Sequence, residues 1–430
     1  QTRRSVRVTE TIARCAITAG GVGTILAVSM IFVFLVWVVV PLFDSPQTGH
    51  DERFDAPSDL PPFHVGVDEE RLLAWTLHRD GKLELHDLTT GERIDSSEPF
   101  GDVPPSAASF GLTDDSAVFG FSDGTARIGR IGFTTSFLTE EEVPDRLRGL
   151  VIGASAVHEG GVVDRTAIGQ LRRTTLDIEF GEAMGTGDQS AVVHVDHVVA
   201  PSGLSLVTYQ ESGALRVSRE RQRRNLLTGE VKTSLKHTDL TANDGTERPV
   251  PVAVGMGGLG QHVYSIAEDG HTEHWDLRDF AAPRLFEEID LTPSVEASVS
   301  AVGFVAGRQT LVIGSEDGQV STWFPARAEA DGEPLLRHVY DLEGAPEPVA
   351  YIAPSPRSRM IAVGFESGLV RLYQASLGED ILSVQGEEPA RALLIAPKED
   401  AILARGAGQL TSWEVDLKYR EATVRALFRP

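Results

Sequence analysis

The sequence contains one cysteine, Cys15, among its 430 residues. A single thiol can form neither an intramolecular disulfide nor a cysteine-based metal site, so neither can support this fold. The chain beyond the N-terminal segment is free of cysteine, which fits an oxidising compartment.

Positive charge is scarce, because 39 Lys and Arg stand against 63 Asp and Glu and give a net charge of -24. Residues 1–43 carry four arginines and one glutamate, a local charge of +3, so residues 44–430 carry -27. An acidic surface repels nucleic acid and anionic solutes at long range. We therefore expect no nucleic-acid partner.

Signatures of catalysis are also missing: the sequence has no phosphate-cradling Gly loop, no HExxH and no GxSxG. Two histidine pairs, His194 with His197 and His271 with His274, have a spacing of three, which in a strand sends the side chains to opposite faces. Sheet histidines are therefore favoured over metal ligands. The loop Asp239–Arg248 lacks the alternating ligand spacing of a calcium site. We predict that the chain is not an enzyme and has no cofactor or metal.

One long stretch, between Arg14 and Asp44, carries no charge. Its strongly apolar part, Ile17–Val40, would be about 36 Å long as a helix, enough to span a bilayer. The run is longer than the core of an export signal and ends in VVVPLFDSP without a small-x-small cleavage site. We predict a transmembrane helix over residues 17–43; the alternative is a buried helix of a soluble protein.

The flanks of this helix predict its orientation. Arginines precede it and acidic residues follow it, so the N-terminus should be cytoplasmic and the bulk of the chain outside. Ala16, Gly20, Gly23 and Ala27 fall three or four residues apart and would let another helix approach closely. The alternative is that small residues are simply common in membrane helices.

A repeat runs through the chain from about Phe63 onward. In each copy an apolar stretch runs into a glycine, usually preceded by Asp or Ser, and then into an alternating stretch. This pattern predicts a buried strand, a tight hairpin turn and a half-exposed strand. The last copy has Ala407 before its glycine. The turn glycines are Gly81, Gly124, Gly213, Gly270, Gly318, Gly368 and Gly408.

Most of these glycines recur 40 to 57 residues apart, and each copy follows another short strand. Four antiparallel strands at this spacing are typical of a β-propeller. We predict an all-β fold, a seven-bladed, WD-repeat-like β-propeller of four-stranded antiparallel blades, preceded by the transmembrane helix. The gap of 89 residues from Gly124 to Gly213 is assigned to an enlarged outer edge of the second blade. An eighth blade within Val162–Phe180 is the alternative.

The domain organisation follows from these segments, with a linker rich in Pro, Asp and Ser between membrane and propeller. The expected parts are a cytoplasmic basic N-terminus (1–16), the transmembrane helix (17–43), the linker (44–62), the propeller (63–418) and the start of a C-terminal connection to a missing region (419–430).

One basic patch, RVSRERQRRN, interrupts the acidic domain. Arginine side chains suit phosphate and carboxylate groups, so the patch is a candidate site for an anion or an acidic partner. The alternative is a hairpin end that faces the protein's own acids. The candidate residues are Arg216, Arg219, Arg221, Arg223 and Arg224.

The order of these features resembles the long form of PstC-type permeases, the membrane subunits of the phosphate-specific ABC transporter. The resemblance rests on the basic N-terminus, the helix ending FLVWVVVPLF, the extracytoplasmic propeller and the exit segment REATVRALFRP. It implies an interaction domain of a phosphate importer permease in the bacterial inner membrane, with a periplasmic propeller. The implied partners are the lipid bilayer, other permease and ATPase subunits and a periplasmic substrate-binding protein. In that family the permease core follows the propeller, so no conducting residue carries over to this sequence.

Two other functions stay open. One is a freestanding membrane-anchored β-propeller scaffold for envelope protein assembly. The other is a propeller enzyme that uses a quinone or a metal. The acidic exterior argues against direct capture of phosphate by the propeller, because like charges repel.

Overall fold

The computed structural model describes residues 4–39, 47–55, 61–139, 141–187, 189–201, 203–224, 231–241, 248–292, 297–327 and 333–416. The chain divides into a helical unit, which reaches Gln47, and a β-sheet unit, Thr48–Val415. Each unit is described by itself.

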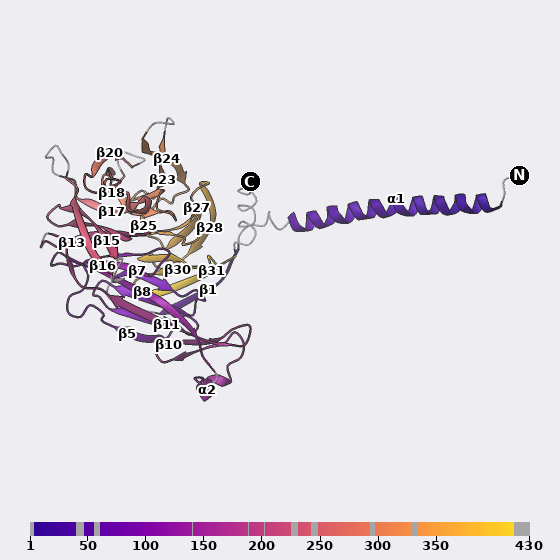
Figure 1. Ribbon diagram of the computed structural model, residues 1–430, viewed down its shortest axis with the longest axis horizontal. Coiled ribbons are helices and arrows are strands. Elements are labelled where there is room, and N and C mark those ends of the chain that lie inside the picture. Colours follow the sequence, from indigo (N-terminus) through magenta and orange to yellow (C-terminus); the bar gives the residue numbers. More distant parts are fainter. Residues whose placement is uncertain are drawn as a thin grey trace. The chain divides into compact units, whose positions relative to one another are not determined.

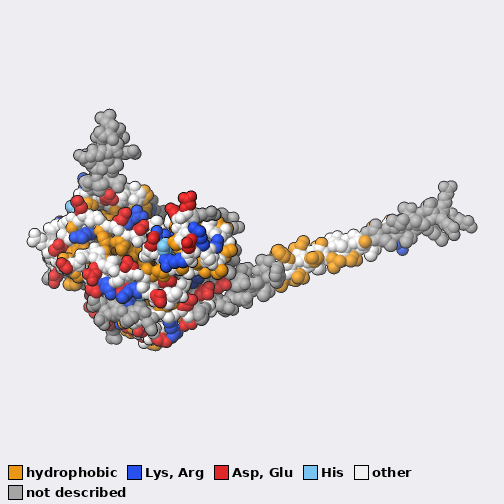
Figure 2. Space-filling model, turned by 90° about the horizontal axis from the view of Figure 1, so that it is seen from below, with side chains coloured by type: hydrophobic (Ala, Val, Ile, Leu, Met, Phe, Trp, Pro, Cys, Tyr) orange, Lys and Arg blue, Asp and Glu red, His pale blue; other side chains and the backbone are white. Residues whose placement is uncertain are grey.

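The helical unit contains one long helix, α1 (Arg4–Val39) (Figure 1). Its segment Ile17–Val36 has 20 residues with a mean hydropathy of 2.3, and all of its side chains are exposed. Figure 2 shows this segment as a band of hydrophobic side chains. Length and hydropathy are therefore sufficient for a membrane span. The helix begins at Arg4, so most of the predicted N-terminal segment is helical too, and residues 40–43 lie outside the described part.

The β-sheet unit is a ring of antiparallel sheets that follow one another in chain order (Figure 1). Five sheets each consist of four consecutive strands. From the centre of the ring outward these are β2 (Pro62–Val67), β3 (Leu73–His78), β4 (Leu83–Asp87) and β5 (Arg93–Ser97); β13 (Val192–Ala200), β14 (Gly203–Gln210), β15 (Leu215–Arg224) and β16 (Val231–Asp239); β17 (Pro251–Gly257), β18 (His262–Ala267), β19 (His271–Asp276) and β20 (Arg284–Asp290); β21 (Val299–Phe304), β22 (Leu311–Ser315), β23 (Val320–Arg327) and β24 (Pro334–Leu342); and β25 (Val349–Pro354), β26 (Met360–Phe365), β27 (Leu369–Gln374) and β28 (Glu379–Gln385). A short 3-10 helix, η2 (Gly258–Gly260), connects β17 to β18.

A sixth four-stranded sheet combines the first strand of the β-sheet unit with its last three strands and so closes the ring. Its strands are β29 (Ala392–Ile395), β30 (Ala401–Arg405), β31 (Gln409–Asp416) and, outermost, β1 (Gln47–Asp55). Residues 47–55 were predicted to belong to the linker, but they form a strand of the propeller. No strand was predicted here, because QTGHDERFD has one large apolar residue, Phe54, and so lacks the apolar alternation typical of a strand. An outermost strand does not need this alternation.

The remaining sheet has seven strands. They are β6 (Ala107–Phe110), β7 (Ser116–Gly120), β8 (Thr125–Phe137), β9 (Ser155–His158), β10 (Gly161–Arg165), β11 (Leu171–Phe180) and β12 (Met184–Gly185), in the order β6-β7-β8-β11-β10-β9 with β12 also beside β8. A four-residue helix, α2 (Asp145–Arg148), lies between β8 and β9.

The prediction of seven four-stranded blades is therefore wrong, because the structure has six four-stranded blades. The copy at Gly124 belongs to the seven-stranded sheet instead. Its strands β8 and β11 are 13 and 10 residues long and pair with each other along nine residues. The strands β10 and β9 continue the same sheet beyond β11. The extra strands of the 89-residue gap join this sheet and do not form a separate blade.

The repeated turns show why Asp or Ser precedes glycine. Six of the seven turn glycines have φ between 77° and 88°, and Gly408, preceded by Ala407, does not. In those six turns the Asp or Ser side chain accepts a hydrogen bond from the backbone N–H of the residue after the glycine, at 2.9 to 3.4 Å. The polar side chain thus holds a turn that the glycine makes sterically accessible.

Apolar side chains fill the space between neighbouring sheets. Leu73 of β3 and Phe119 of β7 share one cluster, and both are fully buried. The ring closes in the same way, because Val65 of β2 and Leu403 of β30 share another cluster with Phe54 packed against it. Strands buried on both faces explain the near-continuous apolar runs of the repeat.

Candidate functional site: the central cavity

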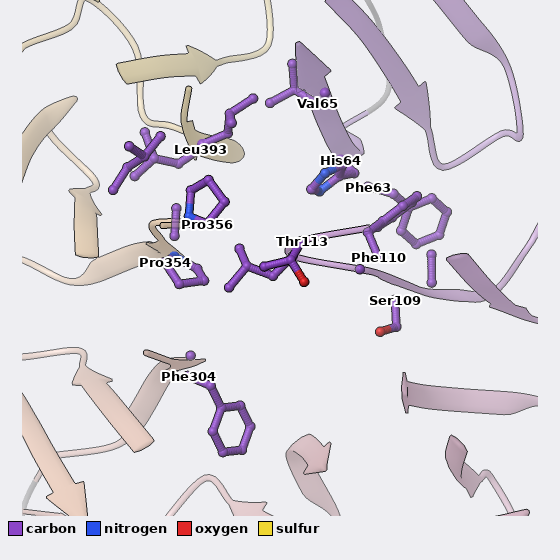
Figure 3. A pocket seen from close by; sticks show the side chains of 18 of the residues that line it. Phe63, His64, Val65, Ser109, Phe110, Thr113, Phe304, Pro354, Pro356 and Leu393 are labelled. Atoms are coloured by element: carbon purple, nitrogen blue, oxygen red, sulfur yellow. The ribbon is translucent and has the colours of Figure 1, made fainter. Parts of the chain in front are cut away.

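The innermost strands of all the sheets line a cavity of about 740 Å³ at the centre of the ring (Figure 3). Apolar side chains of its lining include Phe63, Val65, Phe110, Phe304, Ile352 and Leu393. At one end the lining consists of turns between first and second strands. There Thr113, Asp115 and Arg357 are solvent-exposed, so the cavity reaches the surface at this end.

One wall of the cavity is aromatic. The His64 ring stacks on Phe110 with centroids 4.2 Å apart and planes 14° apart, and the Trp75 ring lies 5.4 Å from His64. Burial lowers the pKa of His64 to about 4, so its imidazole is uncharged near neutral pH. This wall therefore presents a neutral, largely apolar surface to the cavity.

The polar side of the cavity is built around Asp196 of β13. Its carboxylate accepts hydrogen bonds from Ser109 Oγ at 2.9 Å, from the Met256 backbone N–H at 2.7 Å and from Arg308 Nη2. Arg308 Nε also donates to the Met256 carbonyl oxygen at 2.7 Å. Groups from four sheets are thus joined. Because the guanidinium and the carboxylate neutralise each other, the pair offers little attraction to a free anion.

His197 extends this network between two sheets. Its Nδ1 lies 2.9 Å from Ser109 Oγ, and its Nε2 lies 2.8 Å from Ser116 Oγ. Burial lowers the pKa of His197 to about 4, so the ring is neutral near pH 7. Ser109 Oγ donates its proton to Asp196 and Ser116 Oγ donates its proton to Asp114, so the neutral imidazole of His197 donates its one proton to one of the two serine oxygens.

Four turns between first and second strands hold a non-glycine residue at positive φ: Arg71, Leu259, Arg308 and Glu399. This conformation costs about 1–2 kcal/mol for such residues, so compensating contacts are expected. Three of the side chains bind the preceding sheet in the ring. Those contacts are Arg71 Nε to Asp400 at 3.3 Å, Arg308 Nε to the Met256 carbonyl at 2.7 Å, and Glu399 accepting from Ser355 Oγ. Leu259 differs, because its side chain is 61% exposed.

The predicted arginine patch lies on β15, outside the cavity lining. Arg216 donates to the Asp239 carboxylate at 2.6 and 3.0 Å, as expected for a hairpin that faces its own acids. Arg219 donates to Ser205 Oγ and the Gly260 carbonyl, and its guanidinium lies 4.6 Å from the Phe280 ring centroid. The side chains of Arg221, Arg223 and Arg224 lie outside the described residues. A ligand of this patch stays a prediction.

The histidine pairs are divided between different partners. In the first pair, His194 Nε2 lies 2.9 Å from the Pro251 carbonyl oxygen, whereas His197 contacts serines. In the second pair, His274 lies between Glu287 (2.8 Å) and His262 (3.0 Å). Its neighbour His271 lies 3.7 Å from Glu288. Within the described ranges no group of three or more His, Cys, Asp or Glu is arranged to hold a metal ion. Residues 242–247 of the acidic loop lie outside those ranges.

Sequence reasoning missed the polar residues of the cavity, Asp196, Ser109 and Arg308. Ser109 and Asp196 are 87 residues apart and Asp196 and Arg308 are 112 apart, so only the closed ring brings the three together. One signal was available, because Asp196 interrupts the apolar strand HVDHVV. A carboxylate in a buried strand needs a partner.

No protein-family model matches the chain, and no curated protein matches it. Solved structures do match. The crystal structure of the RRP9 WD40 repeats has 11% identity and a TM-score of 0.51, covering 87% of this chain and 99% of that one. The β-propeller domain of Cps50 (Swd1) from Myceliophteria thermophila has 10% identity and a TM-score of 0.54, covering 86% and 100%.

The β-sheet unit has a β-propeller fold like that of WD40-repeat propellers. At such low identity the likeness shows the fold alone. The propeller's function must therefore be argued from its own cavity and surfaces.

Proposed function

We propose that this chain is a membrane-anchored β-propeller scaffold that binds a protein partner at the open end of its central cavity. The length and hydropathy of α1 support the anchor. The expected location is a bacterial inner membrane, with the N-terminus cytoplasmic and the propeller periplasmic. The scaffold takes part in no catalysis.

The observation that carries the proposal is the chemistry of the cavity. Its lining is largely apolar, His64 is neutral, and Asp196 and Arg308 are paired with each other. An apolar side chain of a partner that enters such a cavity gains about 1.5–3 kcal/mol from burial. A charged solute would lose its hydration and find little unpaired charge in return.

The resemblance to phosphate permeases is a hypothesis about the partner. It would make the partner another transporter subunit or a substrate-binding protein, whereas the freestanding scaffold would bind another envelope protein. The described arginines of the predicted patch and of the cavity do not favour phosphate as a ligand, because Arg216, Arg219 and Arg308 all bond to groups of this chain.

Photo-crosslinking at the cavity mouth tests the scaffold. A photoreactive amino acid replaces Thr113, an exposed residue of the lining, in the full chain in its native membrane. The matched control is Thr90, an exposed threonine in the turn between β4 and β5, outside the lining. We expect a defined protein adduct at position 113 and none at position 90. Leu112→Asp, which places a charge beside the cavity, should abolish the adduct.

The outcome also separates the hypotheses. Adducts with an ABC-transporter subunit or a phosphate-binding protein would favour the permease, and adducts with other envelope proteins the freestanding scaffold. Equal labelling at positions 113 and 90, or no protein adduct at all, would contradict the proposal.

A further inference from the structure

The seven-stranded sheet carries an extension, residues 137–171, that exposes apolar side chains. Large apolar residues exposed in it are Phe137, Val151, Ile152, Val157 and Ile168. The exposed fractions of Ile168, Val151 and Ile152 are 80%, 69% and 64%. Exposed aliphatic groups that gather at one place mark an interaction surface more often than single ones do.

These three residues form one surface, here called the tip. Ile168 lies in the turn between β10 and β11, and Val151 and Ile152 lie in the loop before β9. Arg165 holds the two loops together, because its Nε donates to the Gly169 carbonyl at 3.0 Å and its Nη1 to the Leu150 carbonyl at 2.8 Å.

The tip has a firm support. Leu147, Val163 and Leu171 form a small buried core within the extension. Arg172, at the base, binds Asp164 at 2.8 Å and Glu70 of the neighbouring sheet at 2.7 Å. The exposed side chains are therefore held in place by packing and ion pairs.

The extension and the strand β1 both contact the turn between β4 and β5. The turn between β4 and β5 contacts the extension on one side, where Thr89 Oγ1 lies 3.5 Å from Ser155 Oγ. On the other side the Phe54 side chain of β1 lies against Gly91 of the same turn. Only seven residues, 40–46, separate α1 from β1. A bilayer that holds α1 is therefore tethered to the propeller at high effective concentration.

We propose that the tip inserts into the surface of the lipid bilayer that α1 spans. The inference rests on the proposed membrane anchor. The tip consists of two loop ends with exposed aliphatic side chains, which are the groups that enter the boundary between head groups and acyl chains. Two arginines of α2, Arg146 and Arg148, are exposed beside it. Arg146 Nη2 lies 2.9 Å from His158 Nδ1 and Arg148 Nη1 lies 3.3 Å from Asp145, and the remaining exposed N–H groups of the two guanidinium groups suit lipid phosphates. The short covalent link to α1 and these arginines favour lipid over a protein groove as the occupant of the tip.

A fluorophore at the tip tests this in the full chain, reconstituted in nanodiscs of phosphatidylcholine and phosphatidylglycerol with brominated acyl chains. In a Cys15→Ser background, Ile152→Cys carries an environment-sensitive dye. The control is Val339→Cys on β24, which is 43% exposed and lies outside the extension. We expect a blue shift and quenching of about two-fold or more at position 152, and neither at position 339. Adding Val151→Ser and Ile168→Ser should reduce the quenching without changing the thermal midpoint, because both side chains are exposed.

The experiment distinguishes an error in the tip proposal from an error in the proposed membrane anchor. If the chain floats with liposomes through α1 but the dye at position 152 stays water-exposed and unquenched, the tip proposal is wrong and the anchor stands. If the chain does not float, the anchor itself is wrong. Shielding at position 152 that appears only when membrane proteins are added would replace lipid by a protein partner and overturn the proposal.

Discussion

Gly318→Ala should destabilise the propeller much more than the same substitution at Gly213, although both glycines occupy the same repeated turn. Their φ angles are nearly equal, 82° and 87°. A Cβ at position 318 would lie 1.7 Å from the Ala345 carbonyl oxygen and 2.4 Å from the Glu347 carbonyl oxygen. A Cβ at position 213 would meet nothing within 4 Å.

The two positions therefore separate backbone strain from steric overlap. At Gly213 the cost is that of positive φ, about 1–2 kcal/mol, partly offset by about 0.4–1 kcal/mol from the stiffer unfolded chain. The net loss should be about 1 kcal/mol. At Gly318 the two carbonyl groups must also move, and overpacking costs about 1–3 kcal/mol more, for a total of about 2–4 kcal/mol. A third variant, Gly408→Ala, tests the baseline, because that glycine does not have positive φ and a Cβ there would meet only the end of the flexible Glu388 side chain, 2.9 Å away.

Urea unfolding of a fragment spanning residues 47–416, followed by tryptophan fluorescence, measures these losses as shifts in the free energy of unfolding. The expected order of loss is Gly318→Ala, then Gly213→Ala, then Gly408→Ala. Equal losses at Gly318 and Gly213 would refute the steric argument, and a loss at Gly408 as large as at Gly213 would refute the conformational one.

Three further predictions concern the cavity and the ring closure. Arg308→Leu leaves Asp196 without its counter-ion, so the free energy of unfolding measured in urea should fall by about 2–4 kcal/mol. Adding Asp196→Asn to this variant should lower the free energy of unfolding by a smaller further amount. Simple additivity of the two losses in this double-mutant cycle would argue against the ion pair. The folded-state pKa of His64, about 4, lies below its reference value of 6.5, so the unfolded state binds more protons between these values and stability falls as pH drops from 6.5 to 4. His64→Phe should reduce this slope by up to about 1.4 kcal/mol per pH unit, measured as urea midpoints at pH 7 and pH 5, and an unchanged slope would contradict the assignment. Deleting β1 removes Phe54 from its cluster and exposes the edge of β31. The fragment without β1 should therefore lose stability and aggregate, which light scattering would show. A monomeric, equally stable fragment would contradict the role of β1 in closing the ring.

The sequence could predict local features because each depends on neighbours in the chain. The Asp-Gly and Ser-Gly turns were predictable, since the polar side chain binds the N–H two residues later. The apolar stretch that contains Ile17–Val36 was predictable in the same way, since helix length and hydropathy are sums over adjacent residues.

Other features were not predictable from local pattern. The strand β1 has a polar sequence, and it is a strand because β31 offers it an open edge. The copy at Gly124 gave no sign that its strands β8 and β11 continue past the blade, since strand length is set by pairing with a partner distant in sequence. The structure therefore has six four-stranded blades, not the seven that were expected.

The sequence by itself determined the apolar helix, the repeated turns and the β-propeller class, because hydrophobic periodicity and turn chemistry act over a few residues. Only the tertiary structure decided what the propeller can bind. It paired Asp196 with Arg308 across 112 residues, which leaves the polar side of the cavity without free charge. It also gathered Val151, Ile152 and Ile168 on one tip, because Arg165 bonds two loops together. Both arrangements depend on contacts between segments distant in the chain, and no local pattern encodes such contacts.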